Sequence, residues 1–172
     1  MKINQPDLPD GYVPEGTEST FLTWEAVERS LESSLHYWMA TTYPDGRPHV
    51  VPRWGVWTDE RFWYDGSPET RHVRNLEVNP ACALHLESGA EAVISHGWSR
   101  PSRPVGDELG ARLSAEFGRK YSAMGYAPTP DAWSDPAAAG LRCFSPRTII
   151  AWTDFPRNLT RFEFENEEKV NR

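Results

Sequence analysis

The feature that most constrains the fold is a run of short extended segments joined by turns. Residues 36–42 are dense in aromatic and β-branched side chains, which favour strands. Pro44-Asp45-Gly46 is typical of a tight turn, because proline presets φ, aspartate caps the turn and glycine accepts a positive φ. Residues 47–57 are predicted to return antiparallel, and Pro52 within them indicates a sheet edge or a bulge, because proline cannot donate to the ladder.

Further short segments extend this pattern along the chain. A helix is predicted over 69–78, with Val73 and Leu76 facing the core and Asn79-Pro80 ending it. Additional strands are predicted over 61–65, 81–87, 91–99, 148–153 and 160–165. Since strands outnumber helices and the links are short, the sequence predicts a mainly β fold built as a small antiparallel barrel.

Two longer helices and one long loop complete the expected elements. Residues 23–34 and 107–121 carry apolar side chains at helical spacing, and Thr23 is a candidate N-cap for the first helix. Residues 125–140 are rich in Pro, Ala, Asp and Gly, and Trp133 lies in their middle. Loops of that length in a compact domain are commonly functional or mobile.

The chain of 172 residues is about the size of one domain. Residues 1–20 lack periodicity and are expected to be an arm, either loose or draped over a partner. A single domain is predicted over 21–166, with a helix and loop inserted at about 105–142. The charged residues 167–172 are expected to form a fraying tail.

Composition excludes several function classes. A net charge of −7 argues against non-specific nucleic-acid binding, because phosphates repel such a surface. The chain shows neither an apolar signal core nor a run of membrane-spanning length, so a cytoplasmic protein with reduced thiols is expected. The five histidines lack metal-ligand spacing, and no zinc site is predicted. Hydrolase, Walker and dinucleotide-binding motifs do not occur.

The segment Gly66–His72 carries the clearest indication of a ligand-binding site in the sequence. Hydroxyl groups at Ser67 and Thr70, helix-start N–H groups and the basic side chains of Arg71 and His72 converge there. In physical terms this is a cradle for a phosphate. An ordinary helix start with solvated charges explains the same spacing, so both interpretations stay open at this point.

Two further pairs have a ligand-binding and a structural interpretation. Arg53-Trp54 follows Pro52 and would place a cation and an indole beside the third strand, or simply stack a surface cation on a core ring. Trp152 and Arg161 stand on the two arms of the last hairpin, where a packed ring and a rim cation are the commoner arrangement.

Together these segments resemble the pyridoxamine 5'-phosphate oxidase-like superfamily of flavin- and deazaflavin-binding split β-barrels. The resemblance rests on Trp38–Thr41, Pro44–Pro52, Thr70–Leu76 with Asn79-Pro80, Trp152 and Thr160–Phe162. It covers roughly residues 22–99 and 143–165, most of a domain of ordinary size. It implies a six-stranded split barrel and a homodimer that holds two cofactors at the subunit interface.

The resemblance also assigns cofactor-binding positions. Arg71 and His72 match the family's Arg–Lys pair that grips the cofactor phosphate, with His in place of Lys. Trp152 and Arg161 match C-terminal residues that reach the cofactor, often across the dimer. The full implied set is Val51, Pro52, Arg53, Trp54, Ser67, Thr70, Arg71, His72, Trp152 and Arg161, and the residues from Val51 to Trp54 would meet the isoalloxazine ring.

The function implied is an FMN-binding oxidoreductase that transfers hydride to or from a small substrate. Alternatives are a deazaflavin (coenzyme F420)-dependent reductase and a non-catalytic flavin- or haem-related binding protein. FMN is favoured because few basic residues besides Arg71, Arg74, Arg100 and Arg103 offer a groove for the bulkier deazaflavin tail. Pyridoxamine phosphate oxidation ranks lowest, because no basic set for the substrate phosphate aligns.

Overall fold

A computed structural model describes residues 1–14, 16–135 and 140–165 of the chain. Its elements, in chain order, are β1 (Lys2–Asn4), α1 (Trp24–Ser33), β2 (Tyr37–Thr42), β3 (Pro48–Arg53), β4 (Val56–Thr58), β5 (Arg61–Tyr64), α2 (Arg71–Val78), β6 (Ala81–His85), β7 (Ala92–Pro101), α3 (Asp107–Tyr121), a short 3₁₀ turn (Ser122–Met124), β8 (Arg142–Trp152) and β9 (Thr160–Glu163). None of the described helices is long and apolar enough to cross a membrane.

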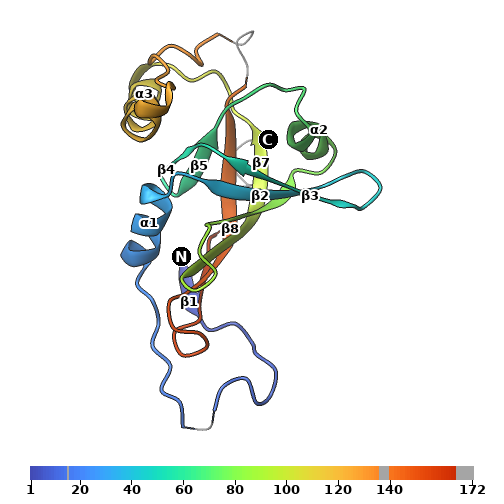
Figure 1. The fold of residues 1–172 in the computed structure, drawn as a ribbon, viewed down its shortest axis with the longest axis vertical. Coiled ribbons are helices and arrows are strands. Elements are labelled where there is room, and N and C mark those ends of the chain that lie inside the picture. Colours follow the sequence, from blue (N-terminus) through green and yellow to red (C-terminus); the bar gives the residue numbers. More distant parts are fainter. Residues whose placement is uncertain (15, 136–139, 166–172) are drawn as a thin grey trace.

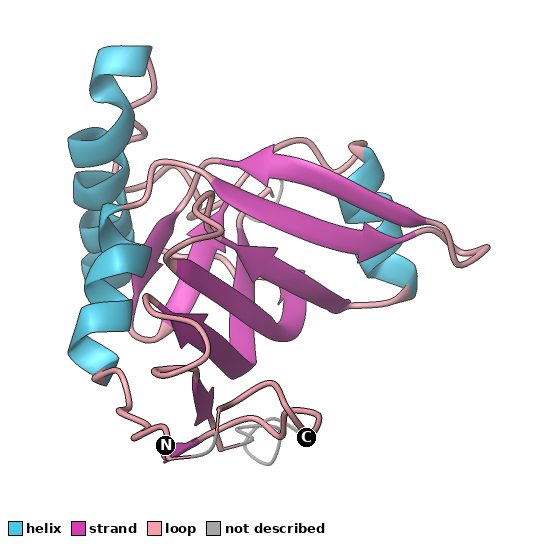
Figure 2. Cartoon of the chain, turned by 60° about the horizontal axis from the view of Figure 1, so that its bottom comes forward, coloured by secondary structure: helices cyan, strands magenta, loops and turns pink. Residues whose placement is uncertain are grey.

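The strands form one curved antiparallel sheet (Figures 1 and 2). The neighbours run β1-β9-β8-β7-β6-β2-β3, and a side arm of β4 and β5 joins through β5 to β8. The eleven-residue β8 is the central strand, because it pairs with β5, β7 and β9. The predicted mainly β, antiparallel split-barrel fold is confirmed. The described residues form nine strands where six were expected, since the return strand is split and short strands are added.

Most of the core lies inside the curved sheet. Tyr37, Phe62, Phe144 and Phe162 are completely buried in it. Helix α1 covers one end of the barrel, and it begins at the predicted N-cap, where Thr23 accepts a hydrogen bond from the Ala26 N–H at 3.3 Å. The apolar stripe of α1 therefore seals the barrel end and leaves its polar face to solvent.

A second apolar cluster attaches helix α3 to the barrel. Leu113 and Phe117 of α3 pack with Val56, Trp63 and Trp133, all of them buried. In Figure 1, α3 stands beside the β4–β5 arm, away from α2. The helix boundaries, Asp107–Tyr121, agree with the predicted range.

The return strand predicted over 47–57 is interrupted. Strand β3 ends at Arg53 and β4 begins at Val56. Gly55 lies in the gap, where a Cβ would fall 2.3 Å from the Phe62 ring. The prediction of an edge position for Pro52 is confirmed, because β3 ends the strand path.

The last hairpin starts earlier than predicted, at residue 142 rather than 148. Pro146 lies within this longer strand, at a bulge where the register with β7 shifts between His96 and Gly97. The missing donor of a proline is tolerated at such an irregularity.

The first residues of the expected arm also differ from prediction, because Lys2–Asn4 pairs with β9 as β1. A three-residue strand carries too little pattern to be seen in the sequence. Residues 136–139 of the predicted 125–140 loop, residue 166 and the predicted tail 167–172 lie outside the described residues.

The bulge allows a sharp test of packing. In Gly97→Ala the new Cβ would lie 2.1 Å from the Ser145 carbonyl oxygen and 2.9 Å from Pro146 Cα, both backbone atoms that cannot swing away. We expect the free energy of unfolding to fall by about 1–3 kcal/mol or more in urea titrations. Gly118→Ala in α3 meets nothing within 4 Å and should raise it by about 0.5–1 kcal/mol. Equal effects of the two changes would contradict the described packing.

Candidate functional site

A half-buried cation stands where β3 ends. The Arg53 guanidinium lies 5.5 Å from the centre of the Tyr64 ring, and its Nη2 donates to the Asp65 carbonyl oxygen at 2.5 Å. Its Nε is buried, and none of the described residues accepts a hydrogen bond from it. Burial lowers the pKa of Arg53, although a guanidinium keeps its charge at neutral pH. Arg53 is therefore a cation with hydrogen-bonding capacity left over.

Trp54 follows and forms an aromatic wall. Its indole, about a third exposed, stacks on Tyr121 with ring centres 5.0 Å apart and planes 11° apart. Pro52, Arg53, Trp54, Asp65 and Tyr126 line a cavity of about 290 Å³, which we call the β3 cavity. Three of the sequence-predicted site residues thus share one cavity.

Asp65 fastens the inserted loop to this cavity. Its carboxylate oxygen Oδ2 accepts hydrogen bonds from Trp133 Nε1 at 2.9 Å and from the Tyr126 hydroxyl. Burial and the neighbouring Asp65 carboxylate raise the pKa of Tyr126, so that this hydroxyl stays a donor. The loop after α3 therefore supplies one wall of the β3 cavity, which the sequence signalled only by its length.

The start of α2 is open to an anion. Thr70 is its N-cap residue, yet its side chain makes no capping bond within the described chain, and the first turn holds no acidic residue. The Thr70 hydroxyl instead donates to the Ser67 carbonyl at 2.9 Å, and Ser67 Oγ accepts from the Glu69 N–H at 3.2 Å. Helix α1 offers a contrast, because it has both a side-chain cap and an acidic first turn.

Arg71 is exposed at this helix start. Its guanidinium lies 5.2 Å from the centre of the Tyr43 ring, which Arg47 also approaches at 4.7 Å. Tyr43 belongs to the turn between β2 and β3, so Arg71 reaches from α2 toward that hairpin. The helix start and strand β3 are therefore neighbours in space.

His72 differs from what its sequence position implied. The side chain is buried, with 3% of the residue exposed, and its ring lies 6.2 Å from that of Tyr64. Burial, followed by the charges of Arg53 and of the nearby His49 and Arg142, lowers its pKa to about 4. At neutral pH His72 is thus a neutral core residue, and it does not add a second cation beside Arg71.

Trp152 and Arg161 lie elsewhere in the chain. Trp152 ends β8, at the opposite end from Arg142, which is paired with Tyr64 near Arg53. Ten residues of strand span roughly 30 Å. Arg161 donates to Asn4 Oδ1 of β1 at 2.7 Å, and β1 lies far from α2 in Figure 1. One chain therefore does not bring these two residues to the β3 cavity.

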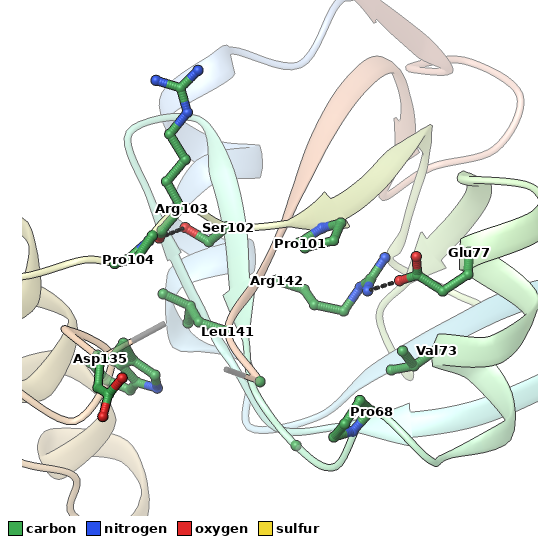
Figure 3. Close-up of a pocket in the computed structure, with 13 residues that line it drawn as sticks. Pro68, Val73, Glu77, Pro101, Ser102, Arg103, Pro104, Asp135, Leu141 and Arg142 are labelled. Atoms are coloured by element: carbon green, nitrogen blue, oxygen red, sulfur yellow. Dashed lines mark hydrogen bonds and ion pairs between the residues drawn. The ribbon is translucent and has the colours of Figure 1, made fainter. Parts of the chain in front are cut away.

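A second cavity, of about 390 Å³, is lined in part by the turn after β5 and by helix α2 (Figure 3). Pro68 and Val73 line it together with Arg142, whose side chain is buried. Arg142 is neutralised by an ion pair with Glu77 at 2.8 Å and donates to the Ser99 carbonyl at 3.3 Å. Its charge is therefore already compensated, in contrast to that of Arg53.

Comparison with known proteins was made by sequence and by structure. The sequence profile of the family described as pyridoxamine 5'-phosphate oxidase matches residues 23–149. Among curated proteins, none is significantly similar to this chain in sequence.

Three solved structures illustrate the structural similarity. An F420 reductase is 25% identical, with a TM-score of 0.52 over 80% of this chain and 98% of that one. HutZ, a haem storage protein from Vibrio cholerae, is 20% identical, with a TM-score of 0.53 over 72% and 89%. A putative pyridoxamine 5'-phosphate oxidase from Listeria innocua is 12% identical, with a TM-score of 0.56 over 76% and 98%. These similarities support the split-barrel fold.

The environment of His72 predicts a distinctive titration. Because its pKa in the folded state is lowered to about 4, the unfolded chain binds more protons between pH 6.5 and 4. His72 should therefore contribute stability above about pH 6.5 that is lost as the pH falls toward 4. Titration of the imidazole signals by NMR should place its midpoint near 4, and a midpoint near 6.5 would contradict its burial.

Proposed function

Because the chain belongs to the pyridoxamine 5'-phosphate oxidase family, we propose that it binds FMN at the start of α2 and along β3 and acts as an oxidoreductase. The observation that carries the proposal is the juxtaposition of two features. One is an uncapped helix start bearing Arg71, and the other is a cavity bearing Arg53 and Trp54. A planar ligand with a terminal phosphate matches both features at once.

The donor set at α2 suits a phosphate. Free N–H groups in the first turn of a helix bind anions, and an arginine fork adds charge-assisted hydrogen bonds. The Ser67 hydroxyl accepts one backbone hydrogen bond, which leaves its own proton free to donate. His72 is buried next to this cradle, so we propose that it supports the cradle by packing and does not contribute a positive charge.

The groups along β3 suit a tricyclic ring. Among the described strands, β3 pairs only with β2, so backbone groups on its outer edge are available to the polar edge of a ring. Arg53 offers a cation in the cavity lining, and Trp54 offers an apolar plane. The residues from Val51 to Trp54 form the proposed floor.

In the proposed reaction the flavin carries out the redox step, and the residues of the chain stabilise charge and shield the cavity. FMN, when bound, supplies hydride transfer to or from a small substrate. Arg53 stabilises negative charge next to the ring. Asp65 holds Tyr126 in place as a wall that shields the cavity from water, and the same carboxylate accepts a hydrogen bond from Trp133.

A homodimer would complete the site. Trp152 and Arg161 cannot meet the β3 cavity of their own chain, as their place on β8 and β9 indicates. We propose that they approach the cofactor of a second copy. The outer edge of β3 and the exposed side chain of Val50, 51% of which is accessible, suit such an interface.

Deazaflavin F420 is the second candidate ligand. It shares a tricyclic ring and a phosphate with FMN, and an F420 reductase is 25% identical to this chain.

The phosphate cradle is tested by Arg71→Ala. We expect the dissociation constant for FMN to rise roughly 10- to 100-fold, because a charge-assisted hydrogen bond is lost. Fluorescence titration of FMN measures this directly. Arg74→Ala, an exposed arginine on the same helix, is the matched control and should change the constant less than about threefold. Unchanged affinity in Arg71→Ala, or an equal loss in both variants, would overturn the assignment.

A further inference from the structure

Two residues at the end of α3 hold the gap between β3 and β4. The Tyr121 hydroxyl accepts a hydrogen bond from the Gly55 N–H at 2.9 Å and lies 2.8 Å from the Gly55 carbonyl oxygen. Lys120 Nζ donates to the same carbonyl at 3.1 Å. The N–H and the carbonyl oxygen of Gly55, which lies between β3 and β4, are therefore both hydrogen-bonded to residues of α3.

Lys120 is an unusual residue for this role. Only 7% of it is exposed, and its Nζ donates to the Tyr37 hydroxyl at 2.9 Å and approaches the Tyr37 ring centre at 4.9 Å. The acceptors that the described residues offer it are neutral. A buried amine without a carboxylate partner is costly, so the hydrogen bonds to Gly55 and Tyr37 are the contacts that offset its desolvation.

Gly55 transmits this contact to the β3 cavity. It directly follows Trp54, whose indole stacks on the ring of Tyr121. Gly55 is also closely packed, since a Cβ there would overlap the Phe62 ring and the Trp63 carbonyl. Any loosening of the end of α3 therefore changes the position of Trp54.

We propose that Lys120 is a positioning residue for the β3 cavity: together with Tyr121 it fixes Gly55, and so sets the orientation of Trp54. Lys120 does not line the cavity itself. The inference rests on the proposed function only where it concerns cofactor affinity. The positioning of Trp54 is a property of the chain alone.

The proton on Lys120 gives this contact a pH dependence. Burial, and then the charge of Arg119, lowers the pKa of Lys120 to about 7, whereas Glu116 and Glu32 act in the opposite direction. The hydroxyls of Tyr37 and Tyr121 have raised pKa values and stay protonated. When α3 detaches, the amine returns to water and an ordinary pKa near 10.5. The open form then binds more protons between pH 7 and 10.5, so attachment strengthens as the pH rises through this window.

The test begins with the ligand-free protein. Lys120→Met keeps an unbranched side chain of similar length but removes the amine that donates to Gly55. The near-ultraviolet circular dichroism signal that Trp54→Phe removes from the wild-type spectrum belongs to the Trp54–Tyr121 stack. We expect Lys120→Met to weaken this signal. Arg29→Met, which removes an exposed cation from α1, is the control and should leave this signal unchanged. An unchanged signal in Lys120→Met would overturn the proposal.

Hydrogen exchange at the Gly55 amide gives a test on the wild type, in case the variant does not fold. Its protection factor should rise between about pH 7 and 9, at most tenfold per pH unit. The protection factor of the Lys120→Met protein should be flat over the same range. A flat wild-type profile would overturn the pH-dependent part of the proposal.

Cofactor titration separates this inference from the proposed function. Lys120→Met should raise the FMN dissociation constant roughly three- to tenfold, because one neutral hydrogen bond that positions the wall is lost. If the wild type binds no FMN while Lys120→Met still changes the circular dichroism, the positioning role is supported and the proposed cofactor is contradicted. If FMN binds both proteins equally, the influence of Lys120 on affinity is overturned.

Discussion

The hydrogen bonds between Gly55 and the end of α3 are the constraint on which the rest of the site depends. If β3 continued into β4 without a break, the backbone of Trp54 would be hydrogen-bonded within the sheet. The interruption frees two backbone groups, and buried backbone groups must find partners. Tyr121 and Lys120 supply those partners, so the same contact ends one strand, docks α3 and exposes an indole beside Arg53.

The turn after β5 is the counterpart of this contact. The Asp65 carboxylate holds Tyr126 and Trp133, while its carbonyl holds Arg53. The inserted helix and loop are therefore fixed to the barrel at two points on either side of one cavity. Such preorganisation suits a fold in which a bound cofactor does the chemistry, because the protein has mainly to bind, orient and shield it.

Much of this architecture could be predicted from the sequence where a local rule decides the outcome. The i, i+4 spacing of Leu109, Leu113 and Phe117 predicted α3, and Pro52 predicted an edge strand. Prediction failed where distant residues decide. Pro146 lies in β8 next to a bulge, where β8 carries one residue more than β7 between the pairs His96–Thr148 and Gly97–Pro146. The burial of His72 could not be seen in the sequence either, and this burial, followed by the charge of Arg53, lowers its pKa to about 4.

The residues that shape the cavity were harder still to see. Lys120 follows Phe117 by three positions, which places it on the apolar face of α3, but beside Arg119 its sequence position suggests a solvated charge. Asp65 ends a predicted strand, and nothing local shows that two donors from a distant loop, Tyr126 and Trp133, will meet its carboxylate. These contacts depend on the packing of the insertion, which no spacing rule describes.

The central claim is that the β3 cavity and the start of α2 form a site for a flavin-like cofactor. Its most direct test is to titrate the purified chain separately with FMN, F420 and haemin, following tryptophan fluorescence and the absorption of each ligand. The account predicts saturable binding of FMN at one site per chain, with quenching of Trp54 that Trp54→Phe removes. Tight haemin binding with no saturable binding of FMN or F420 would contradict it.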